Sequence, residues 1–149
     1  MEETLVIIMA NFSEEQLDKI WKKGVKVDKY DPDYVRKDAC GAWIIRKLYK
    51  DKTSLFGWDV DHIYPVSKLK SLEVPQEKID SLKNLRPLNW RNNESKGTDY
   101  PHYQSKVKAG SKKDENGQED DINVIVEDEK EINYEIQRQI TELFKGYSL

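Results

Sequence analysis

An acid next to an imidazole, Asp61-His62, is the pair of residues in this chain that best suits hydrolytic chemistry. Cleaving a phosphodiester requires a base that takes a proton from water and a cation that neutralises charge on the phosphate. An imidazole is largely unprotonated at neutral pH, and a carboxylate can hold the cation. Adjacent side chains of a strand point to opposite faces, so one strand can aim Asp61 at a metal and leave His62 available to water.

Two asparagines further along the chain extend this set. Asn93 offers a neutral oxygen ligand, and oxygen ligands in an open site favour Mg²⁺, or Mn²⁺ as the alternative, over zinc. Single Asp-His pairs and Asn-rich stretches are also common in turns and caps. The prediction of a site therefore depends on the combination of residues.

The elements that would position these residues can be identified from periodicity and capping residues. Alternation from Trp58 predicts a strand that ends before Pro65, and a long polar connection follows. A second short strand precedes Asn89, which can cap a helix that closes at Gly97. The predicted order is strand, loop, strand, helix, at residues 58–63, 66–83, 84–88 and 89–97.

The flanking segments are predicted to be an N-terminal helix and a C-terminal extension. Ser13 and Gln16 have capping-box spacing at the start of a helix closed by Gly24. Residues 34–49 fit either a helix or a strand, and residues 5–9 fit either a strand or a disordered leader. We also expect an acidic, flexible linker at 110–121, a strand at 122–126 and a helix whose apolar stripe spans 132–144.

Length and composition indicate one domain, with no membrane segment. The 149 residues are 37% hydrophobic and 36% charged. The apolar run near the N-terminus follows two acids and is too short for a signal peptide, so a cytoplasmic location is expected. The single cysteine, Cys40, excludes an internal disulfide and an all-cysteine zinc site.

Charge is distributed unevenly along the chain. Residues 34–113 carry a net +8, whereas residues 1–33 carry −3 and residues 114–149 carry −8. A basic middle region suggests an anionic partner such as nucleic acid, although lysines are also common solvated surface residues.

The ordered motifs resemble those of the HNH endonuclease family. The matching segments are WDVDHIYPVS at 58–67 and LKNLRPLNWRNNESKG at 82–97, and the specific match covers residues 57–97. A looser likeness at residues 30–43 extends toward small stand-alone bacterial and phage HNH proteins. The resemblance implies an α+β fold built round a ββα-metal finger (the His-Me finger), to which the periodicity adds an N-terminal helical cap and a C-terminal helix. We expect the nuclease domain at residues 1–109, followed by the 110–121 linker and a 122–149 extension, and residues 110–149 have no recognised counterpart in the family.

The same resemblance implies roles for individual residues. His62 would be the general base and Asn84 the central asparagine that holds the His-bearing loop. Asp61 and Asn93 would bind one divalent cation, most readily Mg²⁺. The candidates for contacts with the nucleic-acid backbone are Lys96, Arg86 and Arg91.

One departure from the family concerns structural zinc. Many HNH proteins carry two Cys-x-x-Cys pairs, but the corresponding positions here are Cys40, Trp43, Asn89 and Asn92. We therefore expect no structural zinc and expect packing of Trp43, Trp58 and Trp90 to brace the finger.

The resulting hypothesis is a metal-dependent endonuclease, with double-stranded DNA favoured over RNA as substrate. The alternatives are a non-catalytic DNA-binding module, and a nuclease toxin or phage packaging accessory controlled by a partner.

Overall fold

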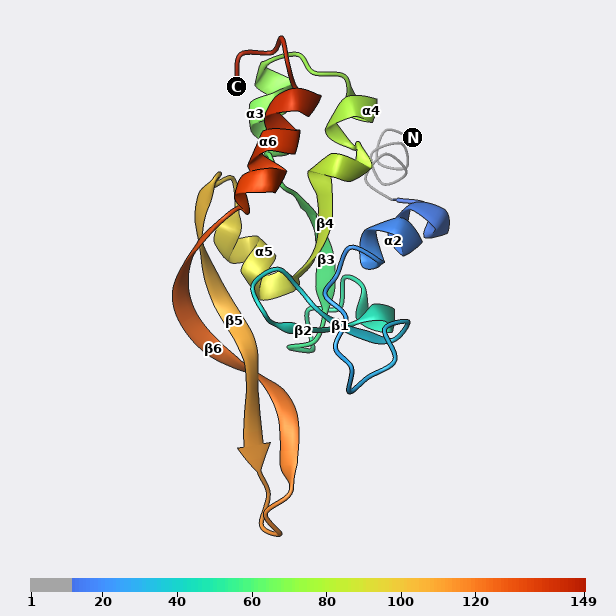
Figure 1. Cartoon of the computed structure of the whole chain (residues 1–149), viewed down its shortest axis with the longest axis vertical. Coiled ribbons are helices and arrows are strands. Elements are labelled where there is room, and N and C mark those ends of the chain that lie inside the picture. Colours follow the sequence, from blue (N-terminus) through green and yellow to red (C-terminus); the bar gives the residue numbers. More distant parts are fainter. Residues whose placement is uncertain (1–11) are drawn as a thin grey trace.

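The computed structural model describes residues 12–149, which form a mixed α+β fold (Figure 1). The described strands form three separate antiparallel pairs. These are β1 (Val35–Lys37) with β2 (Trp43–Ile45), β3 (Trp58–His62) with β4 (Leu85–Asn89), and β5 (His102–Lys113) with β6 (Glu119–Glu131). The α-helices are α2 (Glu14–Trp21), α3 (Val66–Ser71), α4 (Gln76–Ile79), α5 (Trp90–Lys96) and α6 (Tyr134–Leu143), with 3-10 turns at Arg46–Leu48 and Leu82–Asn84. Within residues 12–149, no helix is long and apolar enough to span a bilayer.

The strands β3 and β4 and the helix α5 lie at the centre of the molecule. The register places Asp61 opposite Arg86, and α5 packs against both strands. Asn89 caps α5 by accepting from the Arg91 N–H, and Gly97 ends it at φ +52°, a conformation that favours glycine. The predicted order of strand, connection, strand and helix is confirmed, although the connection contains α3 and α4 rather than an extended loop.

The N-terminal helix α2 covers one face of this central unit. Its capping box is present, since Ser13 accepts from the Gln16 N–H and Gln16 accepts from the Ser13 N–H. Ile20 and Trp21 are fully buried and pack with Trp58 of β3. The helix ends at Trp21, three residues before Gly24. The alternative predictions for residues 5–9 lie outside the described residues.

The segment 34–49, for which a helix and a strand were both open, forms the short strands β1 and β2. Buried Trp43 and Ile44 lie in β2, and the Trp43 amide is further held by the Asn123 side chain at 2.8 Å. A contact with the distant strand β6 therefore stabilises the strand conformation of β2.

The expected flexible linker at 110–121 is wrong. These residues are the far end of the β5–β6 hairpin, which projects from the rest of the molecule (Figure 1). The register places opposite charges across the strands, with Lys112 facing Asp120 and Lys113 facing Glu119. Cross-strand charge pairs stabilise a ribbon whose residues are too polar to predict a strand on hydrophobicity.

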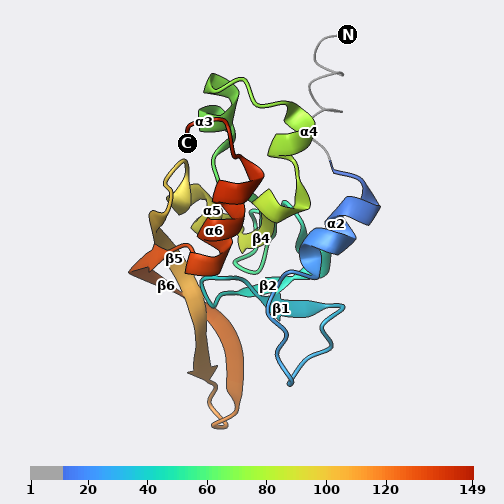
Figure 2. The same cartoon turned by 45° about the horizontal axis from the view of Figure 1, so that its top comes forward.

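The C-terminal segment is part of the main core. Ile132, Ile140 and Phe144 are buried in one cluster with Ile63 and Leu69. Accordingly, α6 lies beside α3 in both views (Figures 1 and 2). The expected division into a 1–109 domain and a 122–149 extension is therefore replaced by one shared core.

Candidate functional site

Asp61 lies at the centre of a buried ion cluster. Its side chain is 3% exposed, and its Oδ2 accepts from Arg86 Nε at 2.8 Å while its Oδ1 lies 3.2 Å from Lys96 Nζ. The Lys96 ammonium also donates to the Ile63 carbonyl at 3.1 Å. Burial lowers the pKa of Lys96, and the Asp61 carboxylate opposes that effect. Both carboxylate oxygens are thus engaged by cations.

This cluster encloses two of the residues expected to contact nucleic acid, and Arg86 also lines a cavity beside it. Lys96 is fully buried and Arg86 is 6% exposed, so neither is a surface side chain. Lys96 is buried because it lies on the side of α5 that faces the strands, where its positive charge offsets the desolvation of Asp61. Arg91 is exposed, with its guanidinium over the Trp90 ring at 5.0 Å.

His62 points away from Asp61, as alternation along β3 requires. Its Nε2 is 2.7 Å from Oδ1 of Asp80, and the side chain is 20% exposed. The other oxygen of Asp80 accepts from Gln76 Nε2 at 3.0 Å. Asp80 was not among the predicted site residues; it lies 18 residues after His62 in a connection expected to be a polar loop. No local pattern marks it, because only the fold of α3 and α4 brings it back to the strand.

Asn84 holds the chain just beyond His62. Its side chain is fully buried; Oδ1 accepts from the Tyr64 N–H at 2.8 Å, and Nδ2 donates to the Ile79 carbonyl at 3.0 Å. The Asn84 carbonyl also accepts from the Ile63 N–H at 2.8 Å. These bonds tie the end of β3 to the segment that precedes β4.

Asn93 lies half-buried on α5, one turn before Lys96. Among residues 12–149, no recorded hydrogen bond or ion pair joins its side chain to Asp61 or His62. The described residues also contain no cluster of three or more His, Cys, Asp or Glu side chains suited to a metal. Because cations already engage both oxygens of Asp61, the residues as arranged do not fit a divalent cation there.

A buried carboxylate, Asp38, contacts Cys40, Asn89 and Asn92, three of the four positions at which zinc ligands were expected to be lacking. Its Oδ1 accepts from the backbone N–H groups of Cys40 and Ala42, and its Oδ2 accepts from the Asn89 N–H and the Asn92 side chain. Burial raises the pKa of Asp38, although all four hydrogen bonds oppose that effect. Burial likewise raises the pKa of the Cys40 thiol to about 11. The hydrogen bonds of Asp38 thus join the loop between β1 and β2 to the start of α5.

The three tryptophans expected to brace the finger contribute unequally. Trp58 and Trp43 are buried, with 2% and 5% of their surface exposed, and Trp90 is only half-buried. The Trp58 ring lies 5.3 Å from the Trp21 ring and 4.8 Å from the Tyr49 ring. Aromatic packing therefore supports the side of the sheet that faces α2, and the Asp38 network supports the junction with α5.

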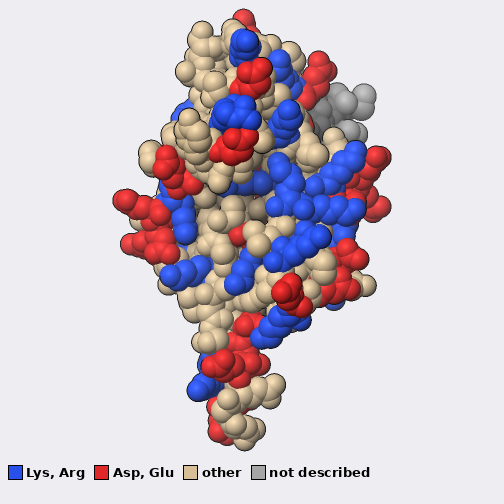
Figure 3. All heavy atoms as spheres, viewed as in Figure 1, with Lys and Arg blue, Asp and Glu red and all other residues tan. Residues whose placement is uncertain are grey.

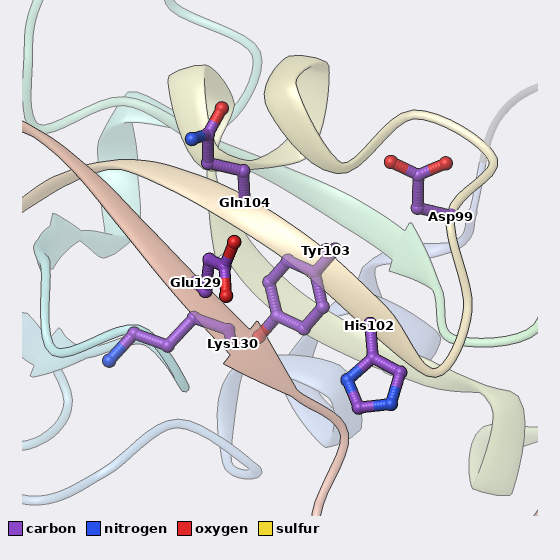
Figure 4. Close-up of a pocket in the computed structure, with 6 residues that line it drawn as sticks. All are labelled: Asp99, His102, Tyr103, Gln104, Glu129 and Lys130. Atoms are coloured by element: carbon purple, nitrogen blue, oxygen red, sulfur yellow. The ribbon is translucent and has the colours of Figure 1, made fainter.

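A cavity of about 350 Å³ at the base of the β5–β6 hairpin lies apart from these residues (Figure 4). Its charged and polar side chains spread in different directions, and Lys130 extends away from the others (Figure 4). Its lining residues are Asp99, His102, Tyr103, Gln104, Glu129 and Lys130. None of the predicted site residues lines it, so it is not part of the candidate site.

The surface over the central unit is basic. Lys and Arg side chains gather on the face over α2, β1 and the segment before β4, while many acidic side chains lie along the hairpin and at the rims (Figure 3). This face supplies an electrostatic surface for an anionic partner.

Comparisons of the chain with models of protein families, with curated proteins and with solved structures find no match.

Proposed function

We propose that this chain is an HNH-type endonuclease that hydrolyses phosphodiester bonds of nucleic acid, with double-stranded DNA as the favoured substrate. The observation that carries the proposal is the placement of the ordered motif on β3, β4 and α5. Asp61 and His62 end β3, Asn84 ties the chain after His62, and Asn93 lies on the helix that packs against both strands. This arrangement supports a ββα finger of the HNH type.

His62 is the proposed general base. Because Nε2 lies at hydrogen-bond distance from Asp80, a neutral His62 carries its proton on Nε2 and leaves the Nδ1 lone pair to accept a proton from water. The water oxygen then attacks phosphorus as the bond to the leaving oxygen breaks; the leaving oxygen takes a proton from solvent, and His62 later releases the proton that it accepted. Asp80 is a positioning residue in this scheme, since it holds the ring without contacting the substrate.

The requirement for Mg²⁺ rests on the family resemblance. The present contacts of Asp61 oppose it, because Lys96 and Arg86 supply positive charge to both carboxylate oxygens. Calorimetric titration of Mg²⁺ and Mn²⁺ into the wild type and Lys96→Met tests the point. If Lys96 excludes the ion, the variant binds it more tightly than the wild type; equal absence of binding in both would remove the metal from the proposal.

The test of the enzyme is cleavage of supercoiled plasmid, with and without added Mg²⁺, Mn²⁺ or chelator. His62→Ala is expected to lower the rate by about 10²-fold or more, the usual contribution of a general base. Asp61→Ala and Asn93→Ala are expected to abolish cleavage as well. The matched control is His102→Ala, since this exposed histidine lies outside the site. Near-wild-type cleavage by purified His62→Ala would overturn the assignment.

A second candidate is a non-catalytic DNA-binding module. The observation that favours it is the inaccessibility of Asp61, which two buried cations neutralise. This candidate predicts retention of a DNA duplex in a gel-shift experiment, together with no cleavage under any metal condition. Cleavage that disappears with His62→Ala would exclude it.

A further inference from the structure

A second cavity, of about 260 Å³, lies beside the Asp61–Arg86 pair. Its walls come from the segment after α2, the β1–β2 loop, the end of β3, the start of β4 and the outer face of α6. The side chains that matter for its chemistry are Lys23, Lys83, Arg86, Gln139, Ile63 and Ile136. The cavity thus combines three cationic side chains and an amide with apolar walls.

The positive charge of this cavity is only partly compensated. Arg86 shares Asp61 with Lys96. No carboxylate in residues 12–149 is recorded in an ion pair with Lys23 or Lys83. In addition, loss of solvation lowers the pKa of Lys23 to about 8, and the nearby positive charge of Arg86 adds to this effect.

Two of the cations have hydrogen-bonding capacity left over. The Lys23 ammonium donates to the carbonyls of Leu82 and Leu85, which uses two of its three N–H groups. The Arg86 guanidinium donates from Nε to Asp61, but its buried Nη2 has no hydrogen-bond partner in the structure. This nitrogen is enclosed by protein, so a ligand in the cavity reaches it only if the Arg86 side chain shifts; the hydrogen bond gained would offset the cost of leaving a buried donor without a partner.

We propose that this cavity binds a phosphate-type oxyanion between Lys23, Lys83 and Arg86. A tetrahedral oxyanion presents several acceptor oxygens, and arginine beside lysine is a common combination for phosphate. If the proposed nuclease function holds, the occupant is a backbone phosphate of the nucleic acid, and the cavity then helps to fix the strand on the basic face next to β3. The site itself requires only the charges and the unpaired donor, so it can be tested without cleavage.

The experiment uses the full chain in the presence of chelator. Inorganic phosphate is titrated at constant ionic strength, with chloride as the reference anion, and binding is followed by calorimetry and by the side-chain N–H resonances of Arg86. The test variant is Lys23→Gln/Lys83→Gln, and the control is Lys68→Gln/Lys70→Gln, which removes the same charge from exposed positions of α3. Thermal unfolding of each variant confirms that it is folded.

We expect phosphate to shift the side-chain N–H resonance of Arg86. We also expect the test variant to bind phosphate about tenfold or more weakly than the control does, because one charge-assisted hydrogen bond has an effect of this size. Equal phosphate binding by the two double variants, or no shift at Arg86, would overturn it.

A short DNA duplex, titrated under the same conditions, identifies the source of the anion. A matching loss of duplex affinity in the test variant supports a backbone phosphate. Loss of phosphate binding with unchanged duplex affinity supports the site but overturns the nucleic-acid source. Failure of plasmid cleavage with phosphate binding intact would overturn the nuclease and leave the anion site standing.

Discussion

At the scale of single residues, two neighbours on one strand have separate surroundings. Asp61 is buried between cations, whereas His62 faces the other side of β3 and contacts Asp80. The pair therefore does not act as one cluster, and each side chain requires its own test.

Asp80→Asn tests the positioning of His62. An amide can no longer hold the imidazole as a carboxylate does, so the cleavage rate should fall by about tenfold, less than for His62→Ala, and the pH profile of the rate should change. Asp99→Asn serves as the matched control, because Asp99 is an exposed carboxylate away from His62. A rate and pH profile identical to wild type for Asp80→Asn would show that Asp80 does not act through His62.

The lowered pKa of Lys23 predicts how the free energy of unfolding changes with pH. Its pKa is lowered to about 8 in the folded protein, whereas a lysine in an unfolded chain titrates near pH 10.4. Between these two values the unfolded state binds more protons, so the contribution of Lys23 to the free energy of unfolding rises with pH. Denaturant titrations at pH 7, 8, 9 and 10 should show this rise in the wild type relative to Lys23→Met. Lys22→Met controls for the loss of one charge; an unchanged pH dependence in Lys23→Met would contradict the lowered pKa.

At the scale of elements, hydrogen bonds from buried polar side chains join segments that are distant in the chain. Asp38 links the β1–β2 loop to the start of α5, and Asn92 links α5 to β5 by accepting from the N–H groups of Lys106 and Val107. The Asn123 side chain of β6 accepts from the Trp43 N–H and donates to the Trp43 carbonyl in β2. The unit formed by β3, β4 and α5 is therefore braced by polar contacts as well as by tryptophan packing.

Asp38→Ala is expected to destabilise the protein by about 3–5 kcal/mol, because it leaves several buried donors without an acceptor. Cys40→Ser should cost far less, about 1 kcal/mol, since the Cys40 thiol makes one long contact, 3.5 Å to the Tyr103 hydroxyl. Chemical denaturation measures both, and elemental analysis tests the expected lack of structural zinc. One zinc per chain that is lost in Cys40→Ser would contradict this account.

At the scale of the whole molecule, the C-terminal segment completes the core, and residues 114–149 also carry a net charge of −8. The net charge of −8 would allow residues 114–149 to act as an acidic tail that competes with phosphates, whereas the apolar stripe of α6 predicts that this segment docks on the core. The structure shows docking, since Ile132, Ile140 and Phe144 are buried with Leu69 of α3 and Leu88 of β4. The acidic hairpin still projects beside the basic face, so charge remains segregated over the surface (Figure 3).

Truncation before Asp114 is therefore expected to abolish folding rather than to release an inhibited enzyme. It removes β6 and α6 and exposes the buried residues that they cover. The matched deletion removes only the hairpin end, residues 112–120, and should preserve a cooperative melting transition. A truncated protein that melts cooperatively and binds DNA more tightly than wild type would restore the autoinhibition hypothesis.

Local sequence determined the parts of this fold that depend on neighbouring residues. The capping box of α2, the strand at 58–62 and the helix from Asn89 to Gly97 follow from side-chain alternation and backbone capping, and all three were predicted. The order of Asp61, His62, Asn84 and Asn93 likewise needed only the sequence.

Tertiary structure decided what those residues contact. Lys96 and Arg86 look like surface cations in the sequence, yet the desolvation of Asp61 makes their burial favourable. The β5–β6 hairpin is polar enough to be read as a linker, because cross-strand charge pairs have no local periodicity. Asp80 and Asp38 gained their roles from partners 18 and 51 residues away. Such contacts depend on chain topology, and the free energy that favours them appears only when the distant segments meet.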